Sequence, residues 1–380
     1  KRLGDICEIV TGATPKTNIK EFWDGDINWI TPAELTEDTY IINESLRKIT
    51  TEGVEKTGLK SFPKGTVILS SRAPIGKVAI AGCEMYCNQG FKNLVCSKQI
   101  NNRFLYWYLK GHKEYLNSLG RGATFKEISK AIVENIEICL PTLEKQEKYA
   151  DILEQCNGII QIKKGQLRKL DTLVKSRFVE LFGDPVINSR GWKKALIGDD
   201  CFVTKLAGFE YTQYINYEDS GDVVMVKAQN VKNGKLNRKE LSFVSNEVSD
   251  SLPRSQLAPR DVVMTYVGAN IGDVAIIDNE YKYHLAPNVA KIRPDSERYN
   301  SIYFMYMLML LNAYIVKNSA DTAKAALGME RIRKLNVFVP PMELQNQFAD
   351  FVTFIDKSKS KIQKSLEETQ LLFDSLMQKY

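Results

Sequence analysis

Residues 63–80 read PKGTVILSSRAPIGKVAI, and residues 259–276 read PRDVVMTYVGANIGDVAI. The two stretches align without a gap, and the second starts 196 residues after the first. Each contains a short β-branched run, an Ile-Gly pair and a second short apolar run, a pattern that predicts two strands joined by a turn. One part of the chain is therefore similar to another.

Two further matches extend this similarity outward. Leu3-Gly4-Asp5 recurs as Ile197-Gly198-Asp199, and residues 138–153 (ICLPTLEKQEKYADIL) align with residues 337–352 (VFVPPMELQNQFADFV). The matches keep the same order, and their separation drifts only from 194 to 199 residues. This predicts one unit copied once, with small loop insertions. A duplicated scaffold without a shared function is the alternative.

The same order of elements is predicted within each copy. A strand-rich region is followed by a helical stretch, at residues 103–118 and 302–317. A short apolar strand ending at proline comes next, at residues 136–141 and 335–341. A long helix closes each copy.

Apolar residues recur at a spacing of three to four in the first long helix, with a thin stretch near residues 163–166. In the second long helix the steps alternate between three and four, which is typical of a coiled-coil seam. The first runs from residue 144 to about 182 and ends at Gly183-Asp184-Pro185. The seam of the second consists of Leu344, Phe348, Phe351, Ile355, Ser358, Ile362, Leu366, Thr369, Leu372, Leu376 and Tyr380.

A helix of about 38 residues spans about 57 Å, and one apolar stripe of that length needs a partner. The other long helix is the simplest partner, and packing of each helix on its own domain is the alternative. The sequence therefore predicts an α+β fold with a pseudo-twofold internal repeat. Two mixed α/β domains are separated by two long helices that form an antiparallel coiled coil.

The composition indicates a protein with buried cores and no membrane segment. No apolar run approaches the roughly 20 residues that span a bilayer, and no signal peptide is recognised. Lys and Arg number 52 against 46 Asp and Glu, a net charge of +6, which permits nucleic-acid binding without demanding it. Seven cysteines, an odd number in a large chain, favour reduced thiols and a cytoplasmic location.

The search for catalytic or metal-binding motifs favours a binding protein over an enzyme. His112 and His284 have different neighbours, and Cys83, Cys87 and Cys96 lack the spacing of a zinc site. No GxxxxGK[ST] phosphate loop occurs. We therefore predict no catalytic residues, no metal and no cofactor.

Two short segments have some features of catalytic sites but do not meet the requirements of one. Residues 339–342 (VPPM) lack the leading acid or amide of the motif of adenine methyltransferases, and they stand where a helix begins. Asp199-Asp200 is the only adjacent acidic pair near a matched segment, and a turn explains it. An enzyme with an unrecognised site stays an alternative.

Together the motifs resemble a known family: each half is similar to a target-recognition domain plus a conserved helical region of the specificity subunit of type I restriction–modification enzymes. In the first half the resemblance rests on residues 3–5 (LGD), 11–15 (TGATP), 23–30 (WDGDINWI), 71–80 (SRAPIGKVAI), 140–141 (LP) with Glu144, Gln146 and Glu147, 170–178 (LDTLVKSRF) and 181–185 (LFGDP). In the second half it rests on residues 284–292 (HLAPNVAKI) and 340–341 (PP) with Glu343 and Gln345. The second half lacks the TGATP and WDGDINWI segments, as two domains that read different DNA sequences would.

The resemblance implies a division of the chain and a function. Residues 1–142 and 184–341 would be target-recognition domains 1 and 2, and residues 143–183 and 342–380 the conserved helical regions. Each domain would read one half of a split double-stranded DNA target, with the coiled coil setting the spacing. Methyltransferase subunits, which carry S-adenosylmethionine, would dock on the helices, and a restriction (motor-nuclease) subunit would join them. The chain itself would be non-catalytic.

Candidate DNA contacts are polar or basic residues at loop-like positions of the repeat. Arg and Lys suit guanine, Asn and Gln suit adenine, and Lys, Arg and hydroxyl groups suit phosphates. In the first domain the candidates are Thr14, Lys16, Arg72, Lys77, Asn88, Gln89, Lys92 and Arg121. In the second they are Tyr211, Lys227, Gln229, Asn230, Tyr266, Asn270, Asn288 and Lys324. The alternative from another functional class is a coiled-coil adaptor that binds only protein.

Overall fold

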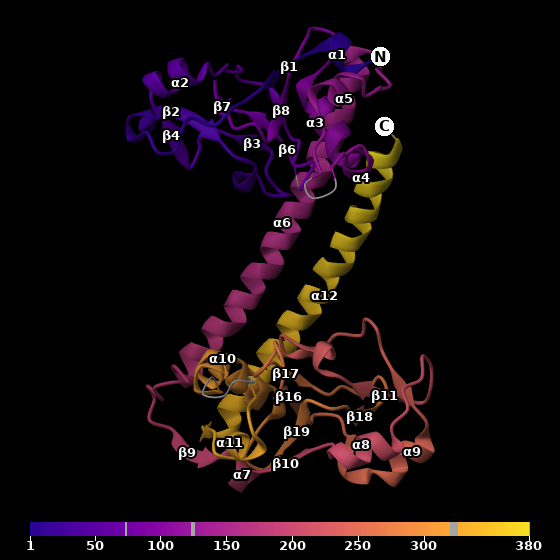
Figure 1. Cartoon of the computed structure of the whole chain (residues 1–380). Helices are drawn as coiled ribbons and strands as arrows, with labels where there is room; N and C mark the ends of the chain where they lie inside the picture. The colour runs from indigo at the N-terminus through magenta and orange to yellow at the C-terminus, as the bar shows by residue number, and fades with distance from the viewer. Residues whose placement is uncertain (73, 123–125, 320–325, 380) are drawn as a thin grey trace. The chain divides into compact units, whose positions relative to one another are not determined.

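The computed structural model describes residues 1–72, 74–122, 126–319 and 326–379. The chain forms two compact units, one of Lys1–Gly165 with Gln363–Tyr380 and one of Gln166–Ile362. Each unit contains one mixed α/β domain together with a segment of each long helix, α6 (Leu143–Phe182) and α12 (Met342–Lys379) (Figure 1).

The domain of the first unit is built on two sheets. The larger has the strand order β1-β8-β5-β6-β3, and the smaller has the order β4-β2-β7. The strands are β1 (Cys7–Thr11), β2 (Trp23–Ile30), β3 (Ile41–Ile42), β4 (Arg47–Ile49), β5 (Val67–Ser70), β6 (Val78–Ala81), β7 (Tyr86–Cys87) and β8 (Phe91–Cys96). The helices are α1 (Leu3–Ile6), η1 (Lys20–Phe22), η2 (Pro32–Glu34), α2 (Thr51–Thr57), α3 (Asn102–Gly111), α4 (Lys113–Ser118) and α5 (Lys130–Glu134).

The domain of the second unit repeats this topology. Its larger sheet has the order β10-β19-β16-β17 and its smaller sheet β14-β11-β18-β15, with β12-β13 and β9-β20 as two-stranded additions. The strands are β9 (Lys193–Leu196), β10 (Cys201–Lys205), β11 (Val223–Val226), β12 (Val231–Lys232), β13 (Lys235–Leu236), β14 (Phe243–Val244), β15 (Gln256–Leu257), β16 (Val262–Thr265), β17 (Val274–Ile276), β18 (Lys282–Leu285), β19 (Val289–Pro294) and β20 (Asn336–Val339). The helices are α7 (Ile197–Asp200), α8 (Gly208–Tyr214), η3 (Ala228–Asn230), α9 (Asn246–Ser251), η4 (Pro253–Ser255), α10 (Ser301–Ser319) and α11 (Met329–Arg333).

The duplication predicted from the sequence is thus confirmed, and it extends to regions where the two sequences no longer match. In the smaller sheets, β2 is antiparallel to β4 and parallel to β7, and β11 is likewise antiparallel to β14 and parallel to β18. The Ile-Gly pair recurs because Gly76 (φ +90°) and Gly272 (φ +81°) have left-handed backbones in the β5–β6 and β16–β17 turns. A side chain at either position would be strained.

A buried glutamine joins each long helix to its domain. Gln146 accepts from the backbone N–H of Asn101 (2.8 Å) and donates to two carbonyl groups, those of Gln99 (3.2 Å) and Pro141 (2.9 Å). Asn101 caps the N-terminus of α3. One side chain therefore satisfies three backbone groups where α3 and α6 begin.

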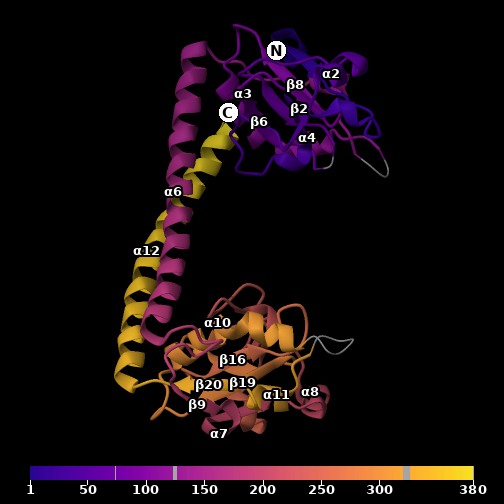
Figure 2. The same ribbon diagram turned by 90° about the vertical axis from the view of Figure 1, so that its left-hand side faces the viewer.

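Gln345 repeats this arrangement in the second unit. It accepts from the N–H of Asn300 (2.8 Å) and donates to the carbonyl groups of Arg298 and Pro340 (both 2.9 Å). Both glutamines are completely buried. The helix α10, which begins at this junction, lies against the β16–β19 sheet (Figure 2).

In the first unit, the C-terminal part of α12 packs beside α6 and against α3. The ammonium group of Lys163 on α6 donates to the carbonyl and hydroxyl oxygens of Ser365 (2.9 and 2.7 Å) and to the hydroxyl group of Thr369 (2.8 Å). The ring of Phe373 packs edge-on against Trp107 of α3, with 5.6 Å between centroids.

In the second unit, the C-terminal part of α6 packs beside the N-terminal part of α12. Phe178 stacks on Tyr303 of α10 (5.6 Å) and packs edge-on against Phe348 (5.4 Å). Nearer the middle of the helices, Lys359 forms an ion pair with Asp171. Residue numbers rise along α6 as they fall along α12, so the pairing is antiparallel, as predicted.

Three predictions about local structure need correction. The helical stretch at residues 103–118 is broken at His112 into α3 and α4, because His112 leaves the helical region (φ −101°, ψ 24°). The strand predicted at residues 136–141 is a single bridge between Glu137 and Arg2, whereas its counterpart β20 pairs fully with β9. Leu372 is 54% exposed, and Phe373 is buried in its place, because α12 meets Trp107 there.

Candidate nucleic-acid interface

Three segments of the first domain meet at the end of β5. The N–H of Ser71 donates to the carbonyl of Gly90 (2.7 Å), and the N–H of Ile128 donates to the carbonyl of Ser71 (2.9 Å). We call this meeting point the first junction. Since Arg72, Asn88, Gln89 and Arg121 lie on these same segments, the fold brings together candidates that are far apart in the sequence.

The second domain forms the same junction with different side chains. The N–H of Tyr266 donates to the carbonyl of Asn288 (2.9 Å), and the N–H of Leu327 donates to the carbonyl of Tyr266 (2.8 Å). We call this the second junction. Candidates Tyr266 and Asn288 thus occupy the positions that Ser71 and Gly90 occupy in the first domain. This corrects the gap-free alignment of residues 63–80 with 259–276, which pairs Tyr266 with Ser70: the turn before Gly272 has one residue more than the turn before Gly76.

The first junction carries a network of charged groups. Glu127 accepts from the Nε of Arg72 (2.9 Å) through one carboxylate oxygen and from the Nζ of Lys92 (3.3 Å) through the other. Although partial burial opposes ionisation of Glu127, the hydrogen bonds from Arg72 and Lys92 lower the pKa of its carboxyl group. The Glu127 carboxylate is therefore ionised at neutral pH.

Two tryptophans hold the loop that contains Thr14 and Lys16. The indole N–H of Trp29 donates to the carbonyl of Ala13 (3.0 Å), and that of Trp23 donates to the carbonyl of Lys16 (3.2 Å). The side chain of Lys16 stays exposed. This arrangement explains why the TGATP and WDGDINWI segments occur together in the first half and are both missing from the second.

The same loop reaches the first junction. The hydroxyl group of Thr14 donates to the side-chain carbonyl of Gln89 (2.6 Å), and Asn88 accepts from the N–H of Gly90 (2.9 Å). In addition, Gly12 lies so close to β7 that a Cβ there would fall 1.9 Å from the carbonyl oxygen of Cys87. A glycine is required at this close approach.

The candidates of the second domain form two groups. Lys227 donates to the hydroxyl group of Ser242 (2.8 Å) and lies 5.5 Å from the ring of Tyr217, which packs against Tyr211 at 6.0 Å. The amide of Gln229 lies 3.4 Å from Glu240. This group surrounds the start of η3.

The second group lies around the second junction. Asn270 and Asn288 are exposed, and Asn288 has a left-handed backbone (φ +69°). Lys205, from β10, lies 5.5 Å from the ring of Tyr266. Burial raises the pKa of Tyr266, which keeps its hydroxyl group neutral.

Three candidates have side chains that the fold already uses. The Nζ of Lys77 donates to the carbonyl groups of Pro32 (3.2 Å) and Leu35 (2.6 Å) at η2. Lys92 is only 6% exposed, and Asn230 is 2% exposed. These three residues support the loops, so we no longer favour them as direct DNA contacts. Lys324 lies outside the described residues.

The structure also adds residues that sequence reasoning missed. The sequence does not single out Glu127, because an acidic residue does not bind phosphate and because its partners Arg72 and Lys92 are far from it in the sequence. Arg47 lies with its guanidinium group 3.7 Å from the ring of Trp23. Lys205 lies between the matched segments 197–199 and 259–276, where the two halves of the sequence do not align. No sequence pattern singled these residues out.

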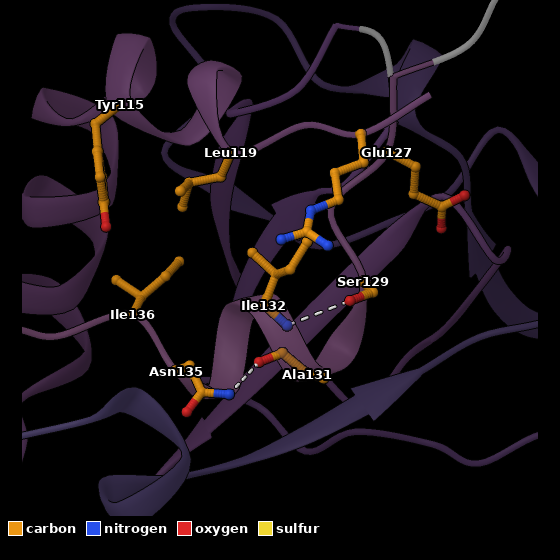
Figure 3. Close-up of a pocket in the computed structure, with 9 residues that line it drawn as sticks. Tyr115, Leu119, Glu127, Ser129, Ala131, Ile132, Asn135 and Ile136 are labelled. Carbon is orange, nitrogen blue, oxygen red and sulfur yellow. Dashed lines mark hydrogen bonds between the residues drawn. The ribbon is translucent and has the colours of Figure 1, made fainter. Parts of the chain in front are cut away.

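A pocket of about 640 Å³ lies beside the first junction (Figure 3). It is lined by Tyr115, Leu119, Arg121, Glu127, Ser129, Ala131, Ile132, Asn135 and Ile136. The hydroxyl group of Ser129 accepts from the N–H of Ile132 (3.2 Å), and the amide of Asn135 donates to the carbonyl of Ala131 (2.8 Å). Both polar groups thus stabilise α5, and the pocket offers no paired nucleophile and base.

The described residues include no group of three or more His, Cys, Asp or Glu side chains placed to hold a metal ion. Among the described helices, none combines the length and the apolar character needed to cross a bilayer.

Comparison with known proteins identifies the family. The family model "Type I restriction modification DNA specificity domain" matches residues 1–172 and again residues 190–369. The type I restriction enzyme MjaIX specificity subunit of Methanocaldococcus jannaschii is 29% identical over 100% of this chain and 91% of its own length. The EcoBI specificity subunit of Escherichia coli is 21% identical over 84% of this chain and 74% of its own length.

Solved structures share the fold. The S subunit of a type I restriction-modification system from M. genitalium has a TM-score of 0.60 at 15% identity, covering 99% of this chain and 94% of that one. A structure from work on complex assembly and conformational transition of the type I R-M system has a TM-score of 0.60 at 17% identity, covering 100% and 96%. The resemblance expected from the sequence is confirmed. The chain belongs to the type I restriction modification DNA specificity family and is a specificity subunit, not a catalytic one.

Proposed function

We propose that the two domains of this specificity subunit read the two halves of one split double-stranded DNA target, and that the long helices set the spacing between them. The observation that carries this proposal is the pair of junctions, which share their backbone hydrogen bonds but not their side chains. A shared frame with different side chains is what two readers of different sequences need, because base edges are read by side chains.

The proposed reading surface of the first domain contains Thr14, Lys16, Gln89, Arg72 and Arg121. The loop of Thr14 is hydrogen-bonded to Gln89, and Arg72 and Arg121 both pair with Glu127, Arg121 through its backbone. In the second domain the proposed surface contains Tyr211, Gln229, Asn270 and Asn288. The domain boundaries that we propose are 1–142 and 184–341 for the recognition domains and 143–183 and 342–380 for the helical regions.

The subunit assembles with methyltransferase subunits, which we place on the long helices, and with a restriction subunit. Apolar side chains on the helices support this location. Ile162 of α6 is 63% exposed in the first unit, and Phe354 of α12 is 67% exposed in the second. A subunit that covered these side chains would bury apolar surface, which favours association. The methyltransferase would supply S-adenosylmethionine, and we place the assembly in the cytoplasm, with the host DNA.

Methylome sequencing of a host that carries this chain with its methyltransferase partner tests the proposal. The expected result is a methylated motif of two specified parts separated by a gap of fixed length. A methylome with no such motif, from a complex that still assembles, would contradict the proposal and favour a protein-binding adaptor.

Two matched variants assign the halves. Gln89→Ala should weaken selection in one half of the motif only, and Asn270→Ala in the other half only. Gln155→Ala, an exposed residue of α6, is the control and should leave both halves unchanged. If Gln89→Ala and Asn270→Ala altered the same half, the assignment of one domain to each half would be wrong.

A further inference from the structure

The network at the first junction holds Arg72 in one orientation. Its Nε donates to Glu127, and the backbones of Arg72 and Glu127 form a bridge. Glu127 is itself fixed by Lys92, whose Nζ also donates to the hydroxyl group of Ser71 (3.1 Å). The exposed fraction falls along this network, from 45% for the side chain of Arg72 to 7% for that of Lys92. An exposed arginine is thus anchored to a buried cation through one carboxylate.

The fold does not need this network, because the second domain makes the same junction without it. Lys92 pairs with Thr11 and Leu69 in its sheet, and the matching strand places Ala290 opposite Lys205 and Met264. The bridge between Arg72 and Glu127 has its counterpart in a bridge between Val267 and Ala326. Three charged residues in one domain therefore correspond to Val267, Ala290 and Ala326 in the other.

Burying a lysine is costly when apolar residues can fill the same place. The first domain accepts this cost, so the network is expected to serve recognition. Its net charge is +1, because Glu127 cancels one of the two cations. A site built only to attract phosphate would omit the carboxylate, which repels the DNA backbone.

The geometry of Arg72 suits a contact with a base edge better than a contact with phosphate. The Nε–H of Arg72 donates to Glu127, so its two Nη groups stay available, and within the described residues neither of them has an acceptor. Two parallel N–H donors match the O6 and N7 acceptors of guanine in the major groove. A carboxylate that fixes the plane of the guanidinium group reduces the ordering cost of that contact.

We infer that Arg72 binds one guanine in the half-site read by the first domain, with Glu127 and Lys92 as positioning residues. This inference rests on the proposed function. The second domain, which has no charged group at these positions, reads its half-site by other contacts.

The test measures affinity of the full chain, assembled with its methyltransferase partner, for the target duplex and for every single-base change in both halves. Arg72→Lys keeps the charge and removes the paired donors. It should reduce the preference for guanine at one position about five- to hundredfold. The preferences at other positions and in the other half should be unchanged.

Glu127→Gln tests the positioning role, with Glu134→Gln as its control. Glu134 lies on α5, carries the same charge and pairs only loosely with Lys130 (3.7 Å). Glu127→Gln should weaken the same guanine preference, and Glu134→Gln should leave it intact. Thermal unfolding verifies that each variant folds. If Glu127→Gln does not fold, the result for Arg72→Lys alone decides the test.

Three results would overturn the inference. The first is an Arg72→Lys variant that keeps every base preference, and the second is an Arg72→Lys variant that binds all duplexes equally more weakly, as loss of a phosphate contact would cause. The third is a Glu127→Gln variant that keeps the guanine preference as Glu134→Gln does. Failure of the proposed function looks different, because the unaltered chain would then show no two-part preference at all.

Discussion

Gln345 is the residue whose replacement best tests how a long helix is joined to its domain. Replacement by leucine removes three hydrogen bonds, from the N–H of Asn300 and to the carbonyl groups of Arg298 and Pro340. The side chain is completely buried, so water cannot replace them. At about 1 kcal/mol for each bond, Gln345→Leu should destabilise the junction of α10 and α12 by about 3 kcal/mol.

Hydrogen exchange of the full chain measures this loss locally. Backbone amides at the starts of α10 and α12 should exchange on the order of 100-fold faster, because opening there costs about 3 kcal/mol less. Gln146→Leu should produce the same change at the starts of α3 and α6. Gln347→Leu, the same replacement at an exposed position of α12, is the control.

Equal effects of Gln345→Leu and Gln347→Leu on hydrogen exchange would contradict this prediction. In that case the buried amide would contribute no more than any other polar side chain of the helix. The matching variant Gln146→Leu would then also be silent, since both glutamines make the same three contacts.

Three further predictions concern stability and DNA affinity. Burial lowers the pKa of His284 in the folded state. Below about pH 6.5 the unfolded state therefore binds a proton that the folded state does not bind. The free energy of unfolding should fall as the pH drops from about 6.5 through the lowered pKa. Urea unfolding at pH 5.5 and 7.5 should show this loss, and His284→Gln should abolish it. Phe373→Ala should cost about 3–5 kcal/mol, because the ring packs on Trp107, whereas Leu371→Ala, at a 71% exposed position, should be silent in thermal unfolding. Lys16→Met should weaken binding to all duplexes equally and reduce the salt dependence by about one charge, and a changed base preference would contradict a phosphate contact.

Much of the fold could be predicted from the sequence because recurring motifs and periodic apolar residues indicate its main elements. The Ile-Gly turns are visible since only glycine tolerates the left-handed backbone of Gly76 and Gly272. The end of α6 is visible for the same reason, at Gly183 (φ +78°). The heptad pattern fails where a contact with another part of the chain decides which face of a helix is buried. Leu372 is the example, because the pattern predicts that it is buried and the structure exposes it. The seam of α12 shifts there because Trp107 of α3 offers a surface that a two-helix model lacks.

The environment of each candidate side chain depends on contacts that form only in the folded chain. By itself the sequence determined the duplication, the long helices and the family, because repeats and heptads are local properties of a chain. Only the tertiary structure decided which polar residues are available for DNA. Lys77 and Lys92 look like Arg72 in the sequence, yet the fold turns their ammonium groups inward, to backbone carbonyls and to Glu127. A buried charge requires a partner, and Glu127 reaches Lys92 and Arg72 only when the chain has folded.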